Sequence, residues 1–228
     1  MRIEPLGDQA ALVYCHDEPE AMRLADAVRR AMPAWCVDVV QAYKSVAAYY
    51  DIEAVDFTQV ADWLDAIPLN DDAAHTIGRL HVIPCCYERG LDFERIERHT
   101  GLAHAAVVEM HSSALFTVYA IGFCPGFPYL GYLPPALAGV PRLESPRLKV
   151  DEGSVGLTGR QTGIYTETRP GGWNIVGRTP LQLVDVRDAY FPLRTGDRVK
   201  FQAITEREFQ ELKGQRLPTT RCNSASQE

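Results

Sequence analysis

Glycine and proline divide the second half of the chain into short segments, and this pattern restricts its fold more than any other feature. From residue 116 onward, β-prone runs alternate with Gly- and Pro-containing turns. The runs lie at 116–121, 154–158, 174–176, 181–186 and 198–202. Many short strands separated by such turns are typical of a closed barrel. The sequence therefore predicts a β-barrel domain over residues 86–212.

The first part of the chain has a different texture, in which strand and helix patterns alternate. Apolar and β-branched runs at 10–14, 37–43, 45–50 and 79–85 predict four strands. Apolar residues at helical spacing predict helices after Asp17, which has Glu20 at capping-box spacing, and after Asp56. The resulting order, β-α-β-β-α-β, matches the ferredoxin-like arrangement.

These patterns together predict an α+β protein of two domains. A ferredoxin-like α+β domain is expected over residues 1–85 and the barrel over 86–212. Residues 213–228 are polar and aperiodic, so we expect a disordered tail there.

The composition is that of an ordinary soluble domain and excludes several classes of partner. Hydrophobic residues make up 46% and the formal net charge is −7, which disfavours nucleic-acid binding. No run approaches the roughly 20 apolar residues of a membrane span, and no signal-peptide pattern opens the chain. The six cysteines are irregularly spaced, so we expect reduced thiols in a cytoplasmic protein. The histidines show no metal-ligand spacing, so no metal site is predicted.

Two near-matches to catalytic motifs fail on context. Residues 172–179 resemble a P-loop with Arg178 in place of lysine, but Pro180 follows where a helix should begin. Residues 153–156 resemble half of a nucleophile elbow, but Glu152 stands where the first glycine belongs.

Two other features remain candidates for a binding site, a loop rich in glycine, proline and aromatic residues and a pair of arginines. Residues 122–131 contain three glycines, two prolines and three aromatic residues, which specify a rigid, irregular loop. Its aromatic side chains suit a pocket or a partner groove. Arg142 and Arg147 each follow a proline, and the planar guanidinium suits a carboxylate or a phosphate.

Further segments of this kind lie at 153–156, 159–165 and 170–180. Taken together, the motifs resemble the sequence pattern of the family of 5-oxoprolinase B-type subunits, also called allophanate hydrolase subunit 1 or KipI-like. Segments at 6–8 and 38–46 fit as well, so the resemblance runs from about residue 3 to about residue 203. The chain departs from the family pattern at Gln41, Asp151, Thr166 and Arg169. These are loop positions, where we expect altered local rigidity.

The resemblance implies an N-terminal α+β domain followed by a cyclophilin-like β-barrel. It implies the B-type subunit of an ATP-dependent 5-oxoprolinase, which converts 5-oxo-L-proline to L-glutamate together with 5-oxoprolinase subunits C and A. The expected cofactor is ATP with Mg at the level of the complex, and the chain is expected to be inactive alone.

The resemblance also suggests roles for individual residues. Arg142 and Arg147 would hold a carboxylate or phosphate, and Gln161 with the backbone at Gly159 and Gly163 would position the amide. His111 would lie at the rim as a proton carrier. The pocket or partner surface would comprise Phe123, Pro125, Gly126, Phe127, Tyr129 and Trp173.

Structural roles remain open for several of these residues. The arginines suit ion pairs, Trp173 suits the core or an interface, and His111 suits a structural position. In that alternative the loops form the surface for the C-type partner. A different function is a KipI-like inhibitor that binds a sporulation histidine kinase. A urea-type carboxyltransferase is a third possibility, although no biotinyl Met-Lys-Met motif is present.

Overall fold

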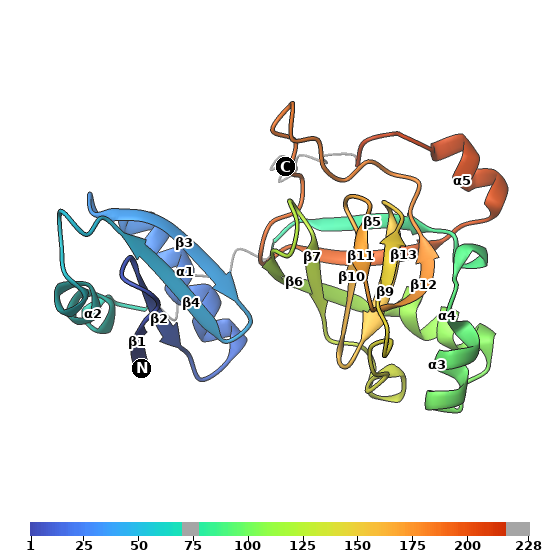
Figure 1. The fold of residues 1–228 in the computed structure, drawn as a ribbon, viewed down its shortest axis with the longest axis horizontal. Coiled ribbons are helices and arrows are strands. Elements are labelled where there is room, and N and C mark those ends of the chain that lie inside the picture. The colour runs from blue at the N-terminus through green and yellow to red at the C-terminus, as the bar shows by residue number, and fades with distance from the viewer. Residues whose placement is uncertain (70–77, 218–228) are drawn as a thin grey trace, which may run out of the picture. The chain divides into compact units, whose positions relative to one another are not determined.

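The structure is a computed structural model that describes residues 1–69 and 78–217. The chain divides into two compact units, Met1–Ile77 and Gly78–Glu228 (Figure 1). Each unit has a hydrophobic core of its own, so the two are described separately.

The first unit is a four-stranded antiparallel sheet with two helices. Its elements are β1 (Arg2–Pro5), β2 (Ala10–Tyr14), α1 (Glu18–Ala31), β3 (Cys36–Ala42), β4 (Ser45–Tyr50) and α2 (Phe57–Ala66). The strand order is β1-β2-β4-β3. Both helices begin where the sequence predicted. The Asp17 side chain accepts from the Glu20 backbone N–H, and Asp56 forms a full capping box with Gln59.

The predicted ferredoxin-like order is not observed in this unit. The described part reads ββαββα, because β1 occupies the sheet edge beside β2 and the run at 79–85 lies elsewhere. That run is β5 (Leu80–Cys85), which pairs in parallel with β13 (Arg198–Ala203) in the second unit. The units divide between Ile77 and Gly78, which is earlier in the chain than the expected end of the first domain at residue 85.

The second unit is built on a nearly closed barrel. Within the described residues, its sheet has the order β12-β9-β10-β7-β6-β13-β5. The remaining strands are β6 (Leu115–Ile121), β7 (Pro128–Gly131), β9 (Ser154–Thr158), β10 (Gln161–Ile164) and β12 (Asn174–Arg178). The edges meet just beyond β5, where Cys86 and Arg178 exchange backbone hydrogen bonds of 2.8 and 3.0 Å. The prediction of a barrel is confirmed at this level.

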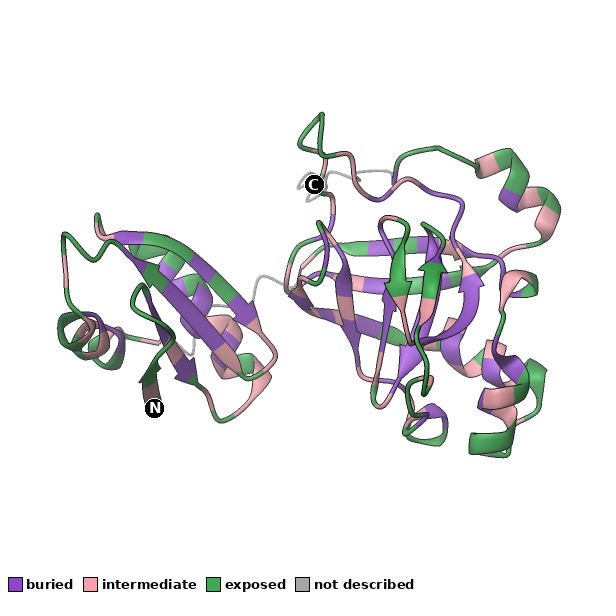
Figure 2. Ribbon diagram, viewed as in Figure 1, coloured by how far each residue is buried: buried purple, intermediate pink, exposed green. Residues whose placement is uncertain are grey.

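The barrel interior is apolar, and every strand of the sheet contributes to it. Ile83, Phe116, Leu130, Leu157 and Phe201 are among the buried residues of this cluster. Figure 2 shows the burial, and β9 is buried along its whole length. Strands with both faces covered need apolar or very small side chains throughout.

Several shorter elements surround the barrel. They are the helices η1 (Tyr87–Arg89), α3 (Phe93–Thr100), α4 (His104–Ser113), η2 (Pro135–Leu137) and α5 (Glu206–Leu212), and the strand pair β8 (Arg147–Val150) and β11 (Arg169–Gly171).

Two predictions about the end of the chain need correction. The run at 181–186 forms isolated bridges rather than a strand, although Leu181 and Leu183 are buried in the barrel core. The predicted disordered tail begins too early, because Leu217 is buried and the Gln215 carbonyl accepts from the Gln182 N–H. The rest of that prediction, 218–228, lies outside the described residues.

Candidate functional site

A pocket of about 250 Å³ opens beside the loop between β6 and β7. Its walls come from that loop and from the segments around residues 142–146, 165 and 170–173. The lining residues are Phe123, Phe127, Tyr129, Arg142, Pro146, Tyr165, Pro170, Gly171, Gly172 and Trp173. The motifs that the sequence singled out at 122–131 and 170–180 therefore meet in space.

Phe127 is the centre of the aromatic wall. Its ring is buried and meets Tyr129, Tyr165 and Trp173 edge to face, with centroids 4.9, 5.4 and 5.5 Å apart. Such pairs favour one arrangement of the rings beyond simple burial. Phe123 packs edge to face on Phe127 at 5.4 Å, but is itself 59% exposed. The wall is thus rigid at its base and open at its rim.

Glycines lie beneath this wall because the rings rest directly on the backbone of the barrel. A Cβ atom at Gly163 would lie 2.8 Å from the Pro128 carbonyl oxygen and 2.9 Å from the Phe127 ring. A Cβ atom at Gly156 would lie 3.1 Å from the Trp173 Cβ. These separations are shorter than van der Waals contact allows. The glycine pattern therefore makes room for the aromatic cluster.

Thr166 fixes the loop from behind. Its hydroxyl donates to the Pro125 carbonyl at 2.7 Å, and the Cys124 Sγ lies 3.4 Å from the same hydroxyl oxygen. The resemblance described above implies a proline at this position, where this chain has Thr166. A hydrogen bond here takes over part of the rigidity that a proline would supply.

Arg142 is the one charged residue among the described residues that line the pocket. No ion-pair or hydrogen-bond partner of its guanidinium is found within the described chain. Its backbone is held firmly, because the Arg95 guanidinium donates to the Arg142 carbonyl at 3.0 Å. The buried Asn174 amide donates to the neighbouring Pro141 carbonyl at 2.9 Å. The result is a fixed loop that presents an unneutralised cation.

The pocket favours neutral phenols and an anionic ligand. Burial raises the pKa of Tyr129 and of Tyr165, and the nearby Arg142 charge opposes that rise in both. Both hydroxyls therefore keep their protons at neutral pH and stay available as donors. An arginine in a partly apolar cavity attracts a carboxylate or phosphate group strongly.

Arg147 has a different environment from Arg142. Its guanidinium pairs with Asp92 at 2.6 Å, and Asp92 is only 8% exposed. The second Asp92 oxygen accepts from the Ile175 backbone N–H at 2.7 Å. Arg147 is not among the residues that line the pocket. The structure thus favours the structural alternative, in which Arg147 fastens β8 to the start of α3.

Replacing Arg147 with alanine should therefore reduce stability. The nearly buried Asp92 carboxylate would lose its charged partner, which costs about 1–3 kcal/mol in free energy of unfolding. Urea denaturation of the variant measures this loss. Adding Asp92→Asn should recover part of it, because no buried charge then remains. Unchanged stability in Arg147→Ala would contradict the assignment.

His111 is not at the pocket rim, so the prediction of a proton carrier there is wrong. Its side chain is 0% exposed inside the barrel unit, stacked on Phe201 at 4.7 Å. Thr162 donates its hydroxyl to the Gly156 carbonyl, so it accepts from the His111 Nε2–H at 3.0 Å. The Nδ1 atom then accepts from the Tyr87 hydroxyl at 2.7 Å. Both ring nitrogens are committed to structural hydrogen bonds.

Burial lowers the pKa of His111 to about 3. The unfolded-state value is about 6.5, so the unfolded chain takes up the proton first as the pH falls. The stability contributed by neutral His111 is complete above about pH 6.5 and is lost towards pH 3, by up to about 1.4 kcal/mol per pH unit.

Urea unfolding between pH 6.5 and 4.5 tests this linkage. The wild-type protein should lose stability across this interval, and His111→Gln should be less stable throughout but show a shallower dependence on pH. Equal slopes would show that His111 does not titrate as its burial requires.

The other predicted residues are not among those that line the pocket. Gln161 begins β10, where it pairs with Thr158 and Gly131. Gly159 has a left-handed φ of 55° in the turn before it, with open space around its Cα. Pro125 and Gly126 shape the loop that carries Phe127.

Sequence reasoning missed residues of two kinds. Tyr165, Gly171 and Gly172 line the pocket and stand in the recognised motifs, so the motif pattern was a usable signal. Arg95 and Asn174 hold the Arg142 loop from positions far along the chain, and no local pattern marks Arg95 for that task.

Comparison with known proteins decides the family. The family described as carboxyltransferase domain, subdomain C and D, matches residues 1–193. A Bacillus subtilis (strain 168) protein described as the B-type subunit of 5-oxoprolinase is 32% identical over 236 aligned positions, which cover 93% of this chain and 96% of that protein. The chain belongs to the family of 5-oxoprolinase B-type subunits. The relative of the same description from Escherichia coli O157:H7 is 46% identical over 133 positions, covering 57% of this chain and 61% of that protein.

Solved structures give the same fold. The structure of TTHA0988 superposes with a TM-score of 0.75 at 33% identity and covers 86% of this chain. The match takes in 40% of the TTHA0988 chain, so the present chain spans about two fifths of it. The Kluyveromyces lactis urea carboxylase has a TM-score of 0.69 at 20% identity, over 92% of this chain and 22% of that one. That likeness shows the fold alone.

Metal-binding clusters and membrane-spanning helices are both absent from the described residues. Among residues 1–69 and 78–217, no three His, Cys, Asp or Glu side chains gather as a metal ion requires. In the same residues, no helix is long and apolar enough to cross a membrane.

Proposed function

We propose that this chain is the B-type subunit of an ATP-dependent 5-oxoprolinase, which converts 5-oxo-L-proline to L-glutamate with partner subunits A and C. The observation that carries the proposal is the unneutralised Arg142 in an aromatic pocket of a chain that belongs to this family. The cyclophilin-like character of the barrel is also part of this proposal.

The pocket suits the substrate in shape and in charge. A flat five-membered lactam can lie against the Trp173 and Tyr129 rings, and its carboxylate can accept hydrogen bonds from the Arg142 guanidinium. The phenols of Tyr129 and Tyr165 remain protonated and can donate to the lactam or the carboxylate. Phe123, which is largely exposed, would close over the bound ring or meet a partner subunit.

The pocket does not contain a complete catalytic apparatus. Among its described lining residues there is no carboxylate, imidazole or thiol that could act as nucleophile or general base. In the proposed reaction ATP would supply the phosphoryl group that activates the lactam oxygen, and addition of water with cleavage of the C–N bond would give glutamate, ADP and phosphate. A nucleophile or general base would then come from subunits A and C, which fits a chain that is inactive alone.

ATP with Mg remains a proposal for the complex as a whole. Mg²⁺ in such sites is held largely by phosphate oxygens and water, so a triad of protein ligands is not essential. No step of the reaction is assigned to a metal ligand of this chain. Pro125, Gly126, Gly159 and Gly163 would shape the loops, and Gln161 would lie at the partner surface.

Reconstitution tests the proposed function. The chain is combined with candidate A and C subunits, and ATP-dependent glutamate formation from 5-oxo-L-proline is measured. Activity should require all three subunits. A folded complex without activity, together with tight binding to a histidine kinase, would instead support the regulatory alternative, which no observation on the structure favours at present.

A further inference from the structure

A second hollow, of about 480 Å³, lies on the barrel unit between η1, β8 and β12. It is larger than the aromatic pocket. Its polar walls are formed by Arg89, Lys149, Asp151, Ser154 and Arg178. Its apolar walls are Leu91, Val150 and Ile175. The volume falls within the range of small-ligand sites in proteins.

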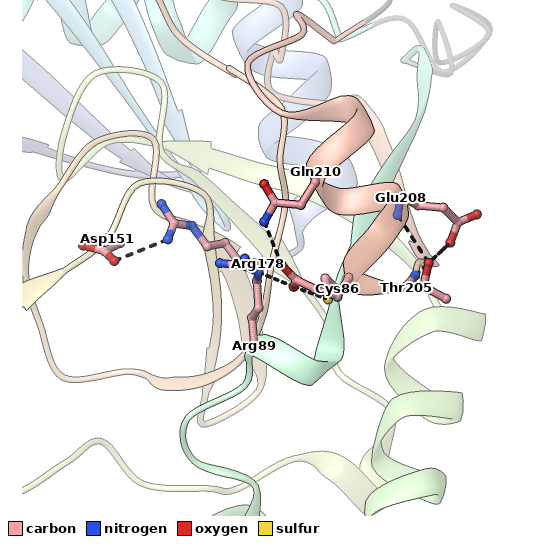
Figure 3. Close-up of polar contacts among 8 residues, drawn as sticks. Cys86, Arg89, Asp151, Arg178, Thr205, Glu208 and Gln210 are labelled. Carbon is pink, nitrogen blue, oxygen red and sulfur yellow. Dashed lines mark hydrogen bonds and ion pairs between the residues drawn. The ribbon is translucent and has the colours of Figure 1, made fainter.

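Positive charge is concentrated around this hollow, although the chain as a whole carries a net charge of −7. Three cations, Arg89, Lys149 and Arg178, line it against one carboxylate, Asp151. Figure 3 shows the Arg178 side chain directed at Asp151. Arg178 and Lys149 each lie 3.3 Å from an Asp151 oxygen. The single Asp151 carboxylate is thus shared by two cations, Arg178 and Lys149.

Arg89 is fixed by a separate carboxylate. Its Nε donates to one Glu206 oxygen at 2.7 Å and its Nη2 to the other at 2.5 Å. Hydrogen bonds from Arg89 and Gln210 lower the pKa of Glu206 to about 2, so this pair stays charged at neutral pH. Even with Glu206 counted, three cations face two carboxylates.

Ser154 provides an independent indication of a ligand. It is 5% exposed and lines the hollow, yet its hydroxyl has no hydrogen-bond partner in the part of the chain that the structure describes. The hydroxyl oxygen is not one of the fully buried, unpartnered side-chain atoms of the described residues, so it opens into the hollow and can donate to a ligand there. A bound anion in the hollow would supply the acceptor that Ser154 lacks.

We propose that this hollow binds a phosphate group, with Arg178, Lys149 and Ser154 as its donors. Asp151, whose side chain is about half exposed, pairs with Lys149 and Arg178 and would be displaced by a bound phosphate. Phosphate carries more charge than one carboxylate and can accept from all three donors at once. The phosphate can belong to a nucleotide or be free, and the hollow's apolar wall at Leu91 leaves room for either.

The phosphate site is separate from the aromatic pocket. Val150 and Ile175 line the hollow, whereas Tyr165 and Trp173, from the same buried cluster, line the pocket. The cluster therefore stands between them. The proposal does not depend on oxoprolinase activity and can succeed or fail without it.

Calorimetric titration of the full-length chain with inorganic phosphate, ADP and ATP tests the proposal. Saturable one-to-one binding is expected. Ser154→Ala and Lys149→Gln should each weaken it about tenfold, since each removes one donor. Asp151→Asn should strengthen it several-fold, because the competing carboxylate is gone. Lys200→Gln, an exposed lysine on β13, is the matched control and should leave the affinity unchanged.

The comparison of ligands identifies the source of the phosphate. Binding of inorganic phosphate as tight as that of ADP assigns a free-phosphate site, and much tighter binding of ADP or ATP assigns a nucleotide site. The melting temperature of Ser154→Ala should not fall, because its hydroxyl has no partner to lose. The proposal is overturned if no ligand binds saturably, or if Lys200→Gln weakens binding as much as Lys149→Gln does.

Discussion

Replacement of Arg142 by glutamine should lower kcat/KM for 5-oxo-L-proline roughly 10- to 100-fold in the reconstituted complex. The guanidinium is the cation in the described lining of the pocket, and a charge-assisted hydrogen bond to a carboxylate contributes about 1.5–3 kcal/mol. The loss should appear mainly in KM, because the carboxylate is held in the ground state as well as in the transition state.

The stability of that variant should be unchanged, since the Arg142 side chain has no partner in the described protein. Arg187→Gln is the matched control, because Arg187 is exposed and lies outside the pocket. Its kinetics should equal those of the wild type. Equal effects of the two substitutions would point to overall charge instead of a specific contact.

Replacement of Gly163 by alanine should destabilise the protein by about 1–3 kcal/mol, through overpacking. The new methyl group would meet the Pro128 carbonyl and the Phe127 ring at less than 3 Å, and neither can move away easily. Phe127 is the centre of the aromatic wall, so a shifted ring should also weaken substrate binding. Thermal denaturation and the KM of the reconstituted complex measure the two effects.

Gly122→Ala is the control for this substitution. Gly122 belongs to the same loop motif, but a Cβ atom there would have nothing within 4 Å. Its stability should match that of the wild type or exceed it slightly, because alanine reduces the freedom of the unfolded chain. If both variants are equally destabilised, the glycines serve backbone flexibility and not ring packing.

The barrel was predictable because its glycine and proline turns are local signals. The run at 79–85 was assigned to the wrong unit, because its partner β13 lies more than 110 residues further along the chain. A strand pattern shows that a strand forms but not which sheet receives it. The run at 181–186 shows the converse, since its leucines enter the core without joining a ladder.

The site was predictable to a similar extent. The aromatic residues and Arg142 were found because they stand in dense motifs. Arg142 and Arg147 have similar sequence contexts, because each follows a proline. Only the three-dimensional structure shows that Asp92 pairs with Arg147 and not with Arg142. His111 was misplaced because a helical histidine gives no sign of whether it faces the core or the solvent.

The proposed role of Arg142 is to bind the carboxylate of the lactam substrate. Its most direct test compares 5-oxo-L-proline with 2-pyrrolidone, the same lactam without a carboxylate, as substrates of the reconstituted wild-type and Arg142→Gln complexes. The wild type should strongly prefer 5-oxo-L-proline, and most of that preference should disappear in the variant. A variant that keeps the full preference would show that the carboxylate is bound elsewhere.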